Sequence, residues 1–287
     1  MRAWLLFLAL LAPIAVSAEL RIATWNLEHL AEEEGAGCRE RNEADYALLR
    51  RYAERLDADV VALQEVESVE AAQRVFDPRR YRIELSRRPD GRSGSCHARS
   101  EAWLTEQRTG FAIRKRVRYQ RHPDLKALRV GGRHGVDITV YDGDAPLRLL
   151  SVHLKAGCFS SRRHTRRDRD CRVLEDQFAA VEGWIDARSR ATEAAAVLGD
   201  FNRRLSRQDP LWRDLADGEP ARLYLLTQGQ RQACRGSYYG QPYIDHIVIN
   251  HHAAHWRRTP LRALAYDEEG KAAPSDHCPL SLELSAP

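Results

Sequence analysis

The chain has 287 residues, a formal net charge of +4, 43% hydrophobic residues and 30% charged residues. That length allows one large domain or two small ones, and six Trp, ten Tyr and six Phe exclude a disordered chain. A mean hydropathy of −0.55 excludes a bundle of transmembrane helices, so the composition predicts a soluble globular protein.

The amino terminus carries an uncharged apolar run over residues 4–16, preceded by Arg2 and followed by Ser17 and Ala18. A membrane-spanning helix needs about 20 apolar residues, whereas a secretory signal peptide has a shorter apolar run with small residues before its cleavage site. We therefore expect residues 1–18 to be a signal peptide cleaved near Ala18, and the mature protein to be secreted or periplasmic. No long linker rich in Pro, Gly or Ser follows, so residues 19–287 are predicted to form a single domain.

The first half of the mature chain predicts strands that alternate with a helix. Buried strands are expected over residues 20–25 and 59–66, and a helix over 43–56, where apolar residues recur at helical spacing. Further strands are expected over 81–85, 110–113, 136–141 and 147–154. The last two are joined by a turn-rich connector that is typical of a hairpin.

The second half continues this alternation. A helix is expected over residues 171–189, where Leu174, Phe178, Val181 and Ile185 share one face. Strands are expected over 195–198, 243–250 and 279–284. Helices and strands in both halves predict an α/β fold in which two mixed β-sheets pack face to face with helices outside.

All six cysteines lie in the mature chain, and an exported protein folds in an oxidising compartment, so three disulfides are expected. Cys158 and Cys171 enclose a short segment and have the lowest loop-closure cost, which favours pairing them. The other four cysteines can be joined in three ways, of which Cys38–Cys96 with Cys234–Cys278 is favoured.

Polar residues that can carry out chemistry follow the ends of several predicted strands. They are Asn26, Glu65, His153, the pair Asp200 and Asn202, and Asp245 together with Asp276 and His277. Each alone fits an ordinary turn, cap or strand end. Their recurrence at five strand ends of one chain is not explained in that way, and it predicts a single catalytic site.

The residue types narrow the chemistry further. Five of them offer only hard oxygen ligands: Asn26, Glu65, Asp200, Asn202 and Asp276. Such ligands suit Mg²⁺ or Mn²⁺ rather than zinc, and an ion with few protein ligands can polarise a phosphoryl group. His153 and His277 can transfer protons or donate to phosphate, and Asp245 is the expected partner that orients His277.

In their order along the chain, these motifs resemble those of the endonuclease/exonuclease/phosphatase superfamily, which is typified by pancreatic deoxyribonuclease and the exonuclease-III-type abasic endonucleases. The matching motifs are WN (25–26), QE (64–65), His153, GDFN (199–202), ID (244–245) and SDH (275–277). They span nearly all of the mature chain. The resemblance, to a secreted bacterial-type member, implies a four-layered α/β sandwich with the site at one edge of the two packed sheets.

The resemblance also implies roles for single residues. Asn26 and Glu65 match the primary divalent-metal positions, and Asp276 lies close to a metal. His153 matches the second histidine of the deoxyribonuclease branch, for which the sequence reveals no carboxylate partner. Arg133 matches a phosphate-contacting arginine.

Four further residues match the hydrolytic machinery of the family. Asp200 and Asn202 resemble the pair that orients the attacking water and binds the scissile phosphate. Asp245 and His277 resemble the carboxylate–histidine pair, on whose side we expect the water to be activated.

Superfamily membership leaves the substrate open. Residues 79–133 carry sixteen Lys and Arg against five Asp and Glu, and residues 158–172 carry six Arg against two Asp. Excess positive charge of this kind favours a polyanion, so the expected reaction is hydrolysis of phosphodiester bonds in extracellular DNA or RNA, with nucleic acid as the substrate.

Two kinds of alternative function are open: an enzyme with the same catalytic site, and a protein without catalytic activity. A phosphatase or a phospholipid phosphodiesterase of the sphingomyelinase type has the same chemistry, although no apolar membrane-docking hairpin is evident in the sequence. A non-catalytic polyanion-binding protein is the alternative from another class. We expect a monomer with no stable membrane association and no obligate protein partner.

Overall fold

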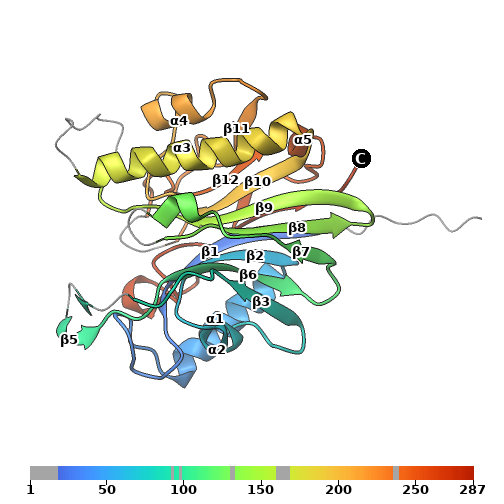
Figure 1. The fold of residues 1–287 in the computed structure, drawn as a ribbon. Coiled ribbons are helices and arrows are strands. Elements are labelled where there is room, and N and C mark those ends of the chain that lie inside the picture. Colours follow the sequence, from blue (N-terminus) through green and yellow to red (C-terminus); the bar gives the residue numbers. More distant parts are fainter. Residues whose placement is uncertain (1–18, 92–93, 97–98, 130–132, 160–168, 235–238) are drawn as a thin grey trace, which may run out of the picture.

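The computed structural model describes residues 19–91, 94–96, 99–129, 133–159, 169–234 and 239–287. Two six-stranded sheets dominate it (Figure 1). The first sheet has the strand order β13 (Arg262–Ala263), β14 (Leu280–Leu284), β1 (Leu20–Leu30), β2 (Val60–Val66), β6 (Arg108–Arg114) and β3 (Tyr81–Leu85). It is mixed, because β1 and β2 are parallel and the other neighbours are antiparallel.

The second sheet repeats this arrangement. Its order is β11 (Leu223–Leu225), β12 (Asp245–Asn250), β10 (Ala194–Asp200), β9 (Ala145–His153), β8 (Val136–Asp142) and β7 (Tyr119–Arg121). Here β9 and β10 form the parallel pair. Each half of the chain therefore contributes one parallel strand pair, whose carboxyl ends reach the same edge of its sheet.

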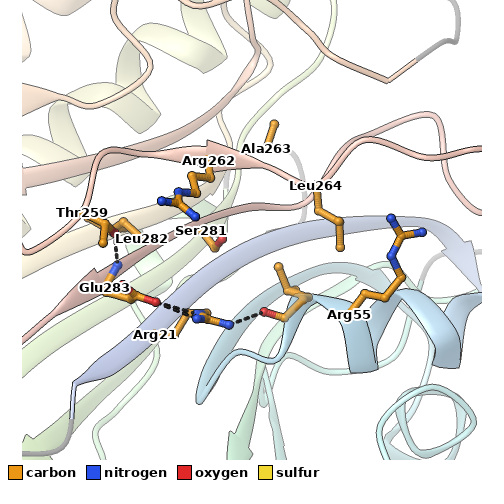
Figure 2. A pocket seen from close by; sticks show the side chains of 10 residues that line it. Arg21, Arg55, Thr259, Arg262, Ala263, Leu264, Ser281, Leu282 and Glu283 are labelled. Carbon is orange, nitrogen blue, oxygen red and sulfur yellow. Dashed lines mark hydrogen bonds and ion pairs between the residues drawn. The ribbon is translucent and has the colours of Figure 1, made fainter.

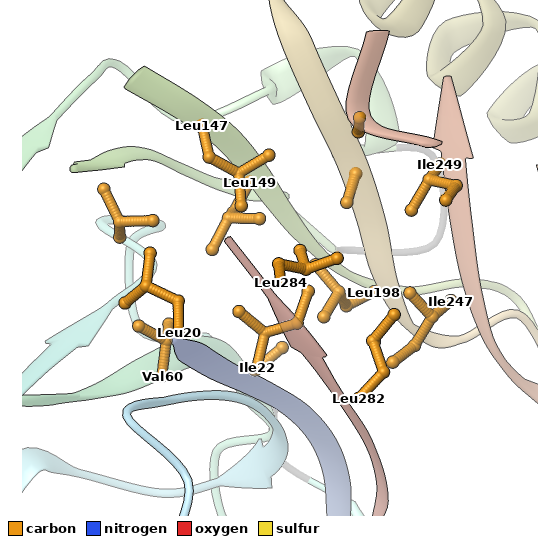
Figure 3. Packing of buried hydrophobic residues seen from close by; sticks show 14 of the residues in the cluster. Leu20, Ile22, Val60, Leu147, Leu149, Leu198, Ile247, Ile249, Leu282 and Leu284 are labelled. Carbon is orange, nitrogen blue, oxygen red and sulfur yellow. The ribbon is translucent and has the colours of Figure 1, made fainter. Parts of the chain in front are cut away.

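Helices cover the outer face of each sheet. Helices α1 (Glu43–Leu56) and α2 (Val69–Gln73) lie on the first sheet, and α3 (Arg169–Arg190) and α4 (Pro210–Leu215) lie on the second (Figure 1). Between the sheets, Leu20 and Ile22 pack with Leu149 and Leu198 in one buried apolar cluster (Figure 3). This arrangement confirms the predicted sandwich of two mixed sheets with helices outside.

Every strand and helix expected from the sequence is present, and α1 and β3 have the predicted bounds. The sequence did not predict the short elements, which include α2, α4, β7, β11 and β13. It also did not predict β4 (Ser95–Cys96) and β5 (Arg99–Trp103), which form a separate hairpin, or α5 (His251–Ala254), η1 (Lys126–Arg129) and η2 (Gly270–Ala272). Nor did it predict that β1 continues to Leu30. Within the described ranges, no helix has the length and apolar character needed to cross a membrane.

Three disulfides join the pairs favoured by the sequence. They are Cys38–Cys96, Cys158–Cys171 and Cys234–Cys278, with Cα–Cα distances of 5.4, 5.1 and 5.5 Å. The first ties the segment after β1 to the β4–β5 hairpin, and the second ties the segment after β9 to α3. The third anchors Cys278, the residue that follows His277.

Candidate active site

Regular strand alternation brings four of the predicted residues to one edge of the sandwich. Successive side chains of a strand point to opposite faces, and the inner face of β1 holds Leu20 and Ile22 in the core between the sheets. The same row ends at Asn26. In β9, β10 and β12, the corresponding inner rows begin or end at His153, Asp200 and Asp245. All four side chains are buried.

Glu65 reaches this edge in a different way. Gln64 occupies the inner position of β2, where its amide contacts the hydroxyls of Thr24 and Ser151, so alternation alone would turn Glu65 outward. Instead, Glu65 has a φ of 61°, in the left-handed region, and the pairing of β2 with β6 shifts register between Leu63 and Val66. This irregularity turns the Glu65 carboxylate into the site.

Asn26 bridges the two sheets. Its Nδ2 donates to Glu65 Oε1 at 3.2 Å and to Asp200 Oδ2 at 3.1 Å, while its Oδ1 accepts a hydrogen bond from the backbone of Glu28. Burial opposes ionisation of Glu65, but the charges of His29, His277 and Arg133 outweigh this effect and lower its pKa. Glu65 is therefore a carboxylate at neutral pH.

His153 has two carboxylate neighbours that the sequence did not reveal. Its Nε2 lies 3.7 Å from Glu65 Oε1 and 3.5 Å from Asp200 Oδ2. Because one carboxylate comes from each sheet, the imidazole lies where the two halves of the site meet.

Asp200 organises the second-sheet side of the site. Its Oδ1 accepts a hydrogen bond from the Asn202 backbone at 2.8 Å, and Asn202 Nδ2 donates to the Leu154 carbonyl at 3.0 Å. Arg133 Nη1 donates to the same carbonyl at 3.2 Å, which places Arg133 beside Asn202. Burial and the nearby Asp245 carboxylate raise the pKa of Asp200 to about 7.

A glycine allows this arrangement. Gly199 has a φ of 151°, and a Cβ atom there would lie 1.9 Å from the carbonyl oxygen of Val152. Only glycine fits so close a backbone approach, which explains the first residue of the GDFN motif.

His277 and Asp245 form the predicted pair. His277 Nδ1 lies 2.7 Å from Asp245 Oδ2, and its Nε2 faces Asp276 Oδ1 at 3.6 Å and Asp200 Oδ2 at 4.0 Å. Burial alone would lower the pKa of His277, but Asp245, Asp276 and Asp200 outweigh it and hold that pKa well above its usual value. His277 is therefore a cation at neutral pH in this arrangement.

The segment that carries His277 is fixed by its neighbours. Ser275 Oγ donates to the carbonyl of Asn26 at 2.8 Å and accepts the His277 backbone N–H at 3.1 Å. Tyr266 donates to the His277 carbonyl at 2.5 Å and accepts from the Trp25 indole at 2.7 Å. The WN and SDH motifs thus hold each other in place.

All nine predicted residues consequently lie in one connected site. Three further residues border it that the sequence analysis missed: Glu28, His29 and Gln107. Glu28 accepts the backbone N–H of Asp276 at 2.9 Å, and burial and Asp276 raise its pKa. No pattern in the sequence marks these residues, because Glu28 and His29 reach the site through left-handed backbone, with φ of 48° and 54°.

The donor set fits a divalent metal ion. Ligand atoms of Asp200, Asp245 and His277 all lie within 4.8 Å of one another. Because a cationic His277 has no lone pair for a metal, the two carboxylates are the usable ligands of this group, and Asp245 Oδ1 is buried without a hydrogen-bond partner in the described part of the chain. Such an orphaned carboxylate oxygen suits a cation. Coordination by Asn26 would use its amide oxygen, which accepts from Glu28 in this structure.

A pocket of about 230 Å³ lies elsewhere, beside the start of β1 (Figure 2). Arg21, Arg55 and Arg262 line it, but Arg21 pairs with Glu283 at 2.6 Å and Arg55 pairs with Asp267 at 2.7 Å. Asn26 lies five residues further along the same strand than Arg21. This pocket is therefore separate from the candidate active site.

The chain belongs to the Endonuclease/Exonuclease/phosphatase family, whose model matches residues 23–277. The enzymes of this family are generally dependent on a divalent metal ion, and the fold supports the hydrolysis of phosphoric esters. A comparison with curated proteins finds no match.

Solved structures share the fold at low sequence identity. D. rerio TDP2 humanised by 14 mutations is 16% identical with a TM-score of 0.59, covering 93% of this chain and 99% of its own. The catalytic domain of human Nocturnin is 15% identical with a TM-score of 0.58, and the match covers 93% of this chain and 94% of the Nocturnin chain. The AP endonuclease LMAP from Leishmania major is 12% identical with a TM-score of 0.60, and the match covers 94% of this chain and 88% of the LMAP chain.

Proposed function

We propose that this protein is a secreted phosphodiesterase that requires Mg²⁺ or Mn²⁺ and hydrolyses DNA or RNA outside the cytoplasm. The observation that carries the proposal is the meeting of Glu65 and Asn26 with the His277–Asp245 pair around Asp200. Oxygen ligands on one side and a cationic histidine on the other suit a phosphate group held between them.

Each of these residues would have a separate role in the reaction. When bound, a divalent ion supplies charge that polarises the phosphoryl oxygen and stabilises the leaving oxygen. Asn202, Arg133 and His153 would hold the phosphate oxygens. His277, kept cationic by Asp245, donates to the developing negative charge rather than accepting a proton.

Proton acceptance from the attacking water is assigned to Asp200. The sequence predicts that water is activated on the Asp245–His277 side, and Asp200 Oδ2 lies on that side, 4.0 Å from His277 Nε2. The raised pKa of His277 makes Asp200 the better base of the two. Asp200 has a pKa of about 7, which is the range that suits a general base. Asn202, hydrogen-bonded to Asp200 at 2.8 Å, would orient the water.

The disulfide bonds support the proposal that the protein is secreted. Three disulfides suit an oxidising compartment and are rare in the cytosol. The expected signal peptide, residues 1–18, lies outside the described residues, so its cleavage remains a prediction.

The charge argument for nucleic acid is weaker than the composition of residues 79–133 implies. Ion pairs join Arg88 to Glu106, Arg108 to Asp90, Arg114 to Asp57, Arg116 to Asp59 and Arg118 to Asp144. Paired arginines have less charge to offer a phosphate backbone. The arginine-rich segment 158–172 lies largely outside the described residues. Among the described residues, Arg133 at the site is therefore the main support for nucleic acid as the substrate.

One experiment tests this proposal. The full chain is expressed with export, purified oxidised, and incubated with plasmid DNA, single-stranded DNA, RNA, sphingomyelin and a generic phosphodiester, with Mg²⁺ or with EDTA. We expect nucleic-acid cleavage with Mg²⁺ that EDTA and the His277→Ala variant abolish. Binding to nucleic acid without turnover would identify a polyanion-binding protein and overturn the proposal.

A lipid phosphodiesterase is the second candidate, and one feature favours it. Trp103, at the end of the β4–β5 hairpin, is 69% exposed, as an aromatic side chain that docks at a membrane surface would be. Turnover of sphingomyelin in vesicles, lost in a Trp103→Ala variant that still cleaves the generic phosphodiester, would favour this candidate over the nuclease.

A further inference from the structure

The Glu65 carboxylate is held from two sides. Oε1 lies beside Asn26 Nδ2 at 3.2 Å and His153 Nε2 at 3.7 Å. Oε2 accepts the backbone N–H of His29 at 3.0 Å, and the Nε2 atom of the same residue lies 3.5 Å away. His29 therefore contacts the oxygen that faces away from Asn26, and it is the residue that closes this side of the carboxylate.

The His29 ring is oriented by a second residue. Gln107 is buried just before β6, and its Nε2 lies 3.0 Å from His29 Nδ1. With the amide nitrogen toward it, Nδ1 accepts and a neutral ring carries its hydrogen on Nε2, and in the cationic ring Nε2 carries a hydrogen as well. Nε2 is the ring nitrogen that lies 3.5 Å from Glu65 Oε2. Gln107 thus holds the ring with Nε2 on the side of the carboxylate, as outer partners do for metal-ligating groups.

The backbone is bent to allow this contact. Glu28 and His29 both have left-handed φ values, and the pairing of β1 with β2 shifts register between Asn26 and Leu30. Left-handed backbone is unfavourable for residues other than glycine, and at functional sites it persists because the surrounding structure holds it. The bend gives Glu65 Oε2 both the backbone and the ring of His29.

We propose that His29 and Gln107 are positioning residues that fix the Glu65 carboxylate so that Oε1 faces the metal position beside Asn26. Neither residue touches the reacting phosphate in this assignment. The inference rests on the metal dependence of the proposed function, and it adds to that function a supporting pair drawn from β1 and the segment before β6.

Metal binding tests the inference without relying on turnover. The full chain, exported and purified oxidised, is titrated with Mn²⁺ by calorimetry and by the electron paramagnetic resonance signal of the free ion. We expect His29→Ala and Gln107→Leu each to raise the Kd for Mn²⁺ about tenfold, the lower range for loss of an outer partner. Gln120→Leu is the matched control, since Gln120 is an exposed glutamine on β7.

Two further measurements separate positioning from folding. His29→Gln keeps an N–H donor near the place of Nε2, and we expect it to bind Mn²⁺ within about threefold of the wild type, unlike His29→Ala. Because alanine is strained at the φ of 54° of His29, Gln107→Leu provides the variant with an unaltered backbone. Its melting temperature in EDTA should stay at the wild-type value.

The outcomes distinguish this inference from the proposed function. Unchanged Mn²⁺ affinity in both His29→Ala and Gln107→Leu, with a wild type that cleaves nucleic acid, overturns the inference and leaves the function intact. Weakened Mn²⁺ binding in both variants of a protein that cleaves no nucleic acid supports the inference and overturns the function. A wild type that binds no Mn²⁺ overturns both.

Discussion

The two sheets supply the site in different ways. The second sheet places His153, Asp200 and Asp245 by plain strand alternation, at the ends of rows whose other members fill the core between the sheets. The first sheet places Glu65 through a left-handed residue and a shift in strand register. The second-sheet residues, like Asn26 on β1, thus follow from the regular period of a strand, whereas Glu65 depends on local departures from it.

This difference has a physical origin in Gln64. The inner position of β2 is filled by its amide, which links Thr24 on β1 to Ser151 on β9 across the buried space. A glutamate in that place would be buried among uncharged groups, at a large cost. The left-handed turn lets the next residue carry the charge to the edge of the sandwich, where His153 and Asn26 lie.

The largest expected effect is the loss of activity when one residue is removed from either half of the site. His277→Ala removes the cation paired with Asp245, and Glu65→Ala removes the carboxylate of the first sheet. We expect each to lower kcat/KM about 10³-fold, the range for losing a group that stabilises the transition state. Turnover assays measure the loss, and circular dichroism checks that both variants stay folded. Retained turnover in either variant would contradict the assignment.

A second prediction concerns the regular half. Gly199→Ala forces a Cβ to within 1.9 Å of the Val152 carbonyl oxygen, so β9 and β10 must separate. We expect a loss of about 3–5 kcal/mol in the free energy of unfolding, measured by urea denaturation. Gly143→Ala is the matched control, because Gly143 also has positive φ but no atom near its Cβ position; it should lose only about 1 kcal/mol. Equal losses would mean that backbone conformation, not close approach, sets the cost.

A third prediction uses the raised pKa of Asp200. Its folded pKa of about 7 lies above the ordinary value of 3.8, so the folded state binds more protons between these values and stability falls as pH rises through them. Asp200→Asn removes that penalty. In EDTA it should be more stable than the wild type by on the order of 2 kcal/mol at pH 8, and by little near pH 4, while activity is lost. Urea denaturation at both pH values measures this, and an equal gain at both would show that ionisation of Asp200 is not what destabilises the wild type.

The sequence predicted most of this fold because its signals are periodic. Apolar residues at helical spacing gave α1 and α3, and buried strands of ordinary length gave the two sheets. The nine site residues could be named because they stand in motifs whose order resembles a known family. Glu28, His29 and Gln107 could not, since their approach depends on left-handed backbone and on a contact between residues 78 positions apart. The ion pairs of residues 79–133 were likewise invisible to a count of charges.

The smallest expected effect is that of a Gln64 substitution, which tests whether the position of the Glu65 carboxylate depends on Gln64. Gln64→Leu removes the acceptor of the Thr24 hydroxyl, while Ser151 keeps its hydrogen bond to the Leu63 carbonyl at 3.2 Å. We expect a loss of about 1–2 kcal/mol in the free energy of unfolding and a change in kcat/KM of less than about tenfold, because His29 and Asn26 still hold the Glu65 carboxylate. Urea denaturation and turnover assays measure the two effects. A loss of activity as large as that of Glu65→Ala would show that the contact between the sheets at Gln64, rather than the left-handed turn and its hydrogen bonds, places the first-sheet carboxylate.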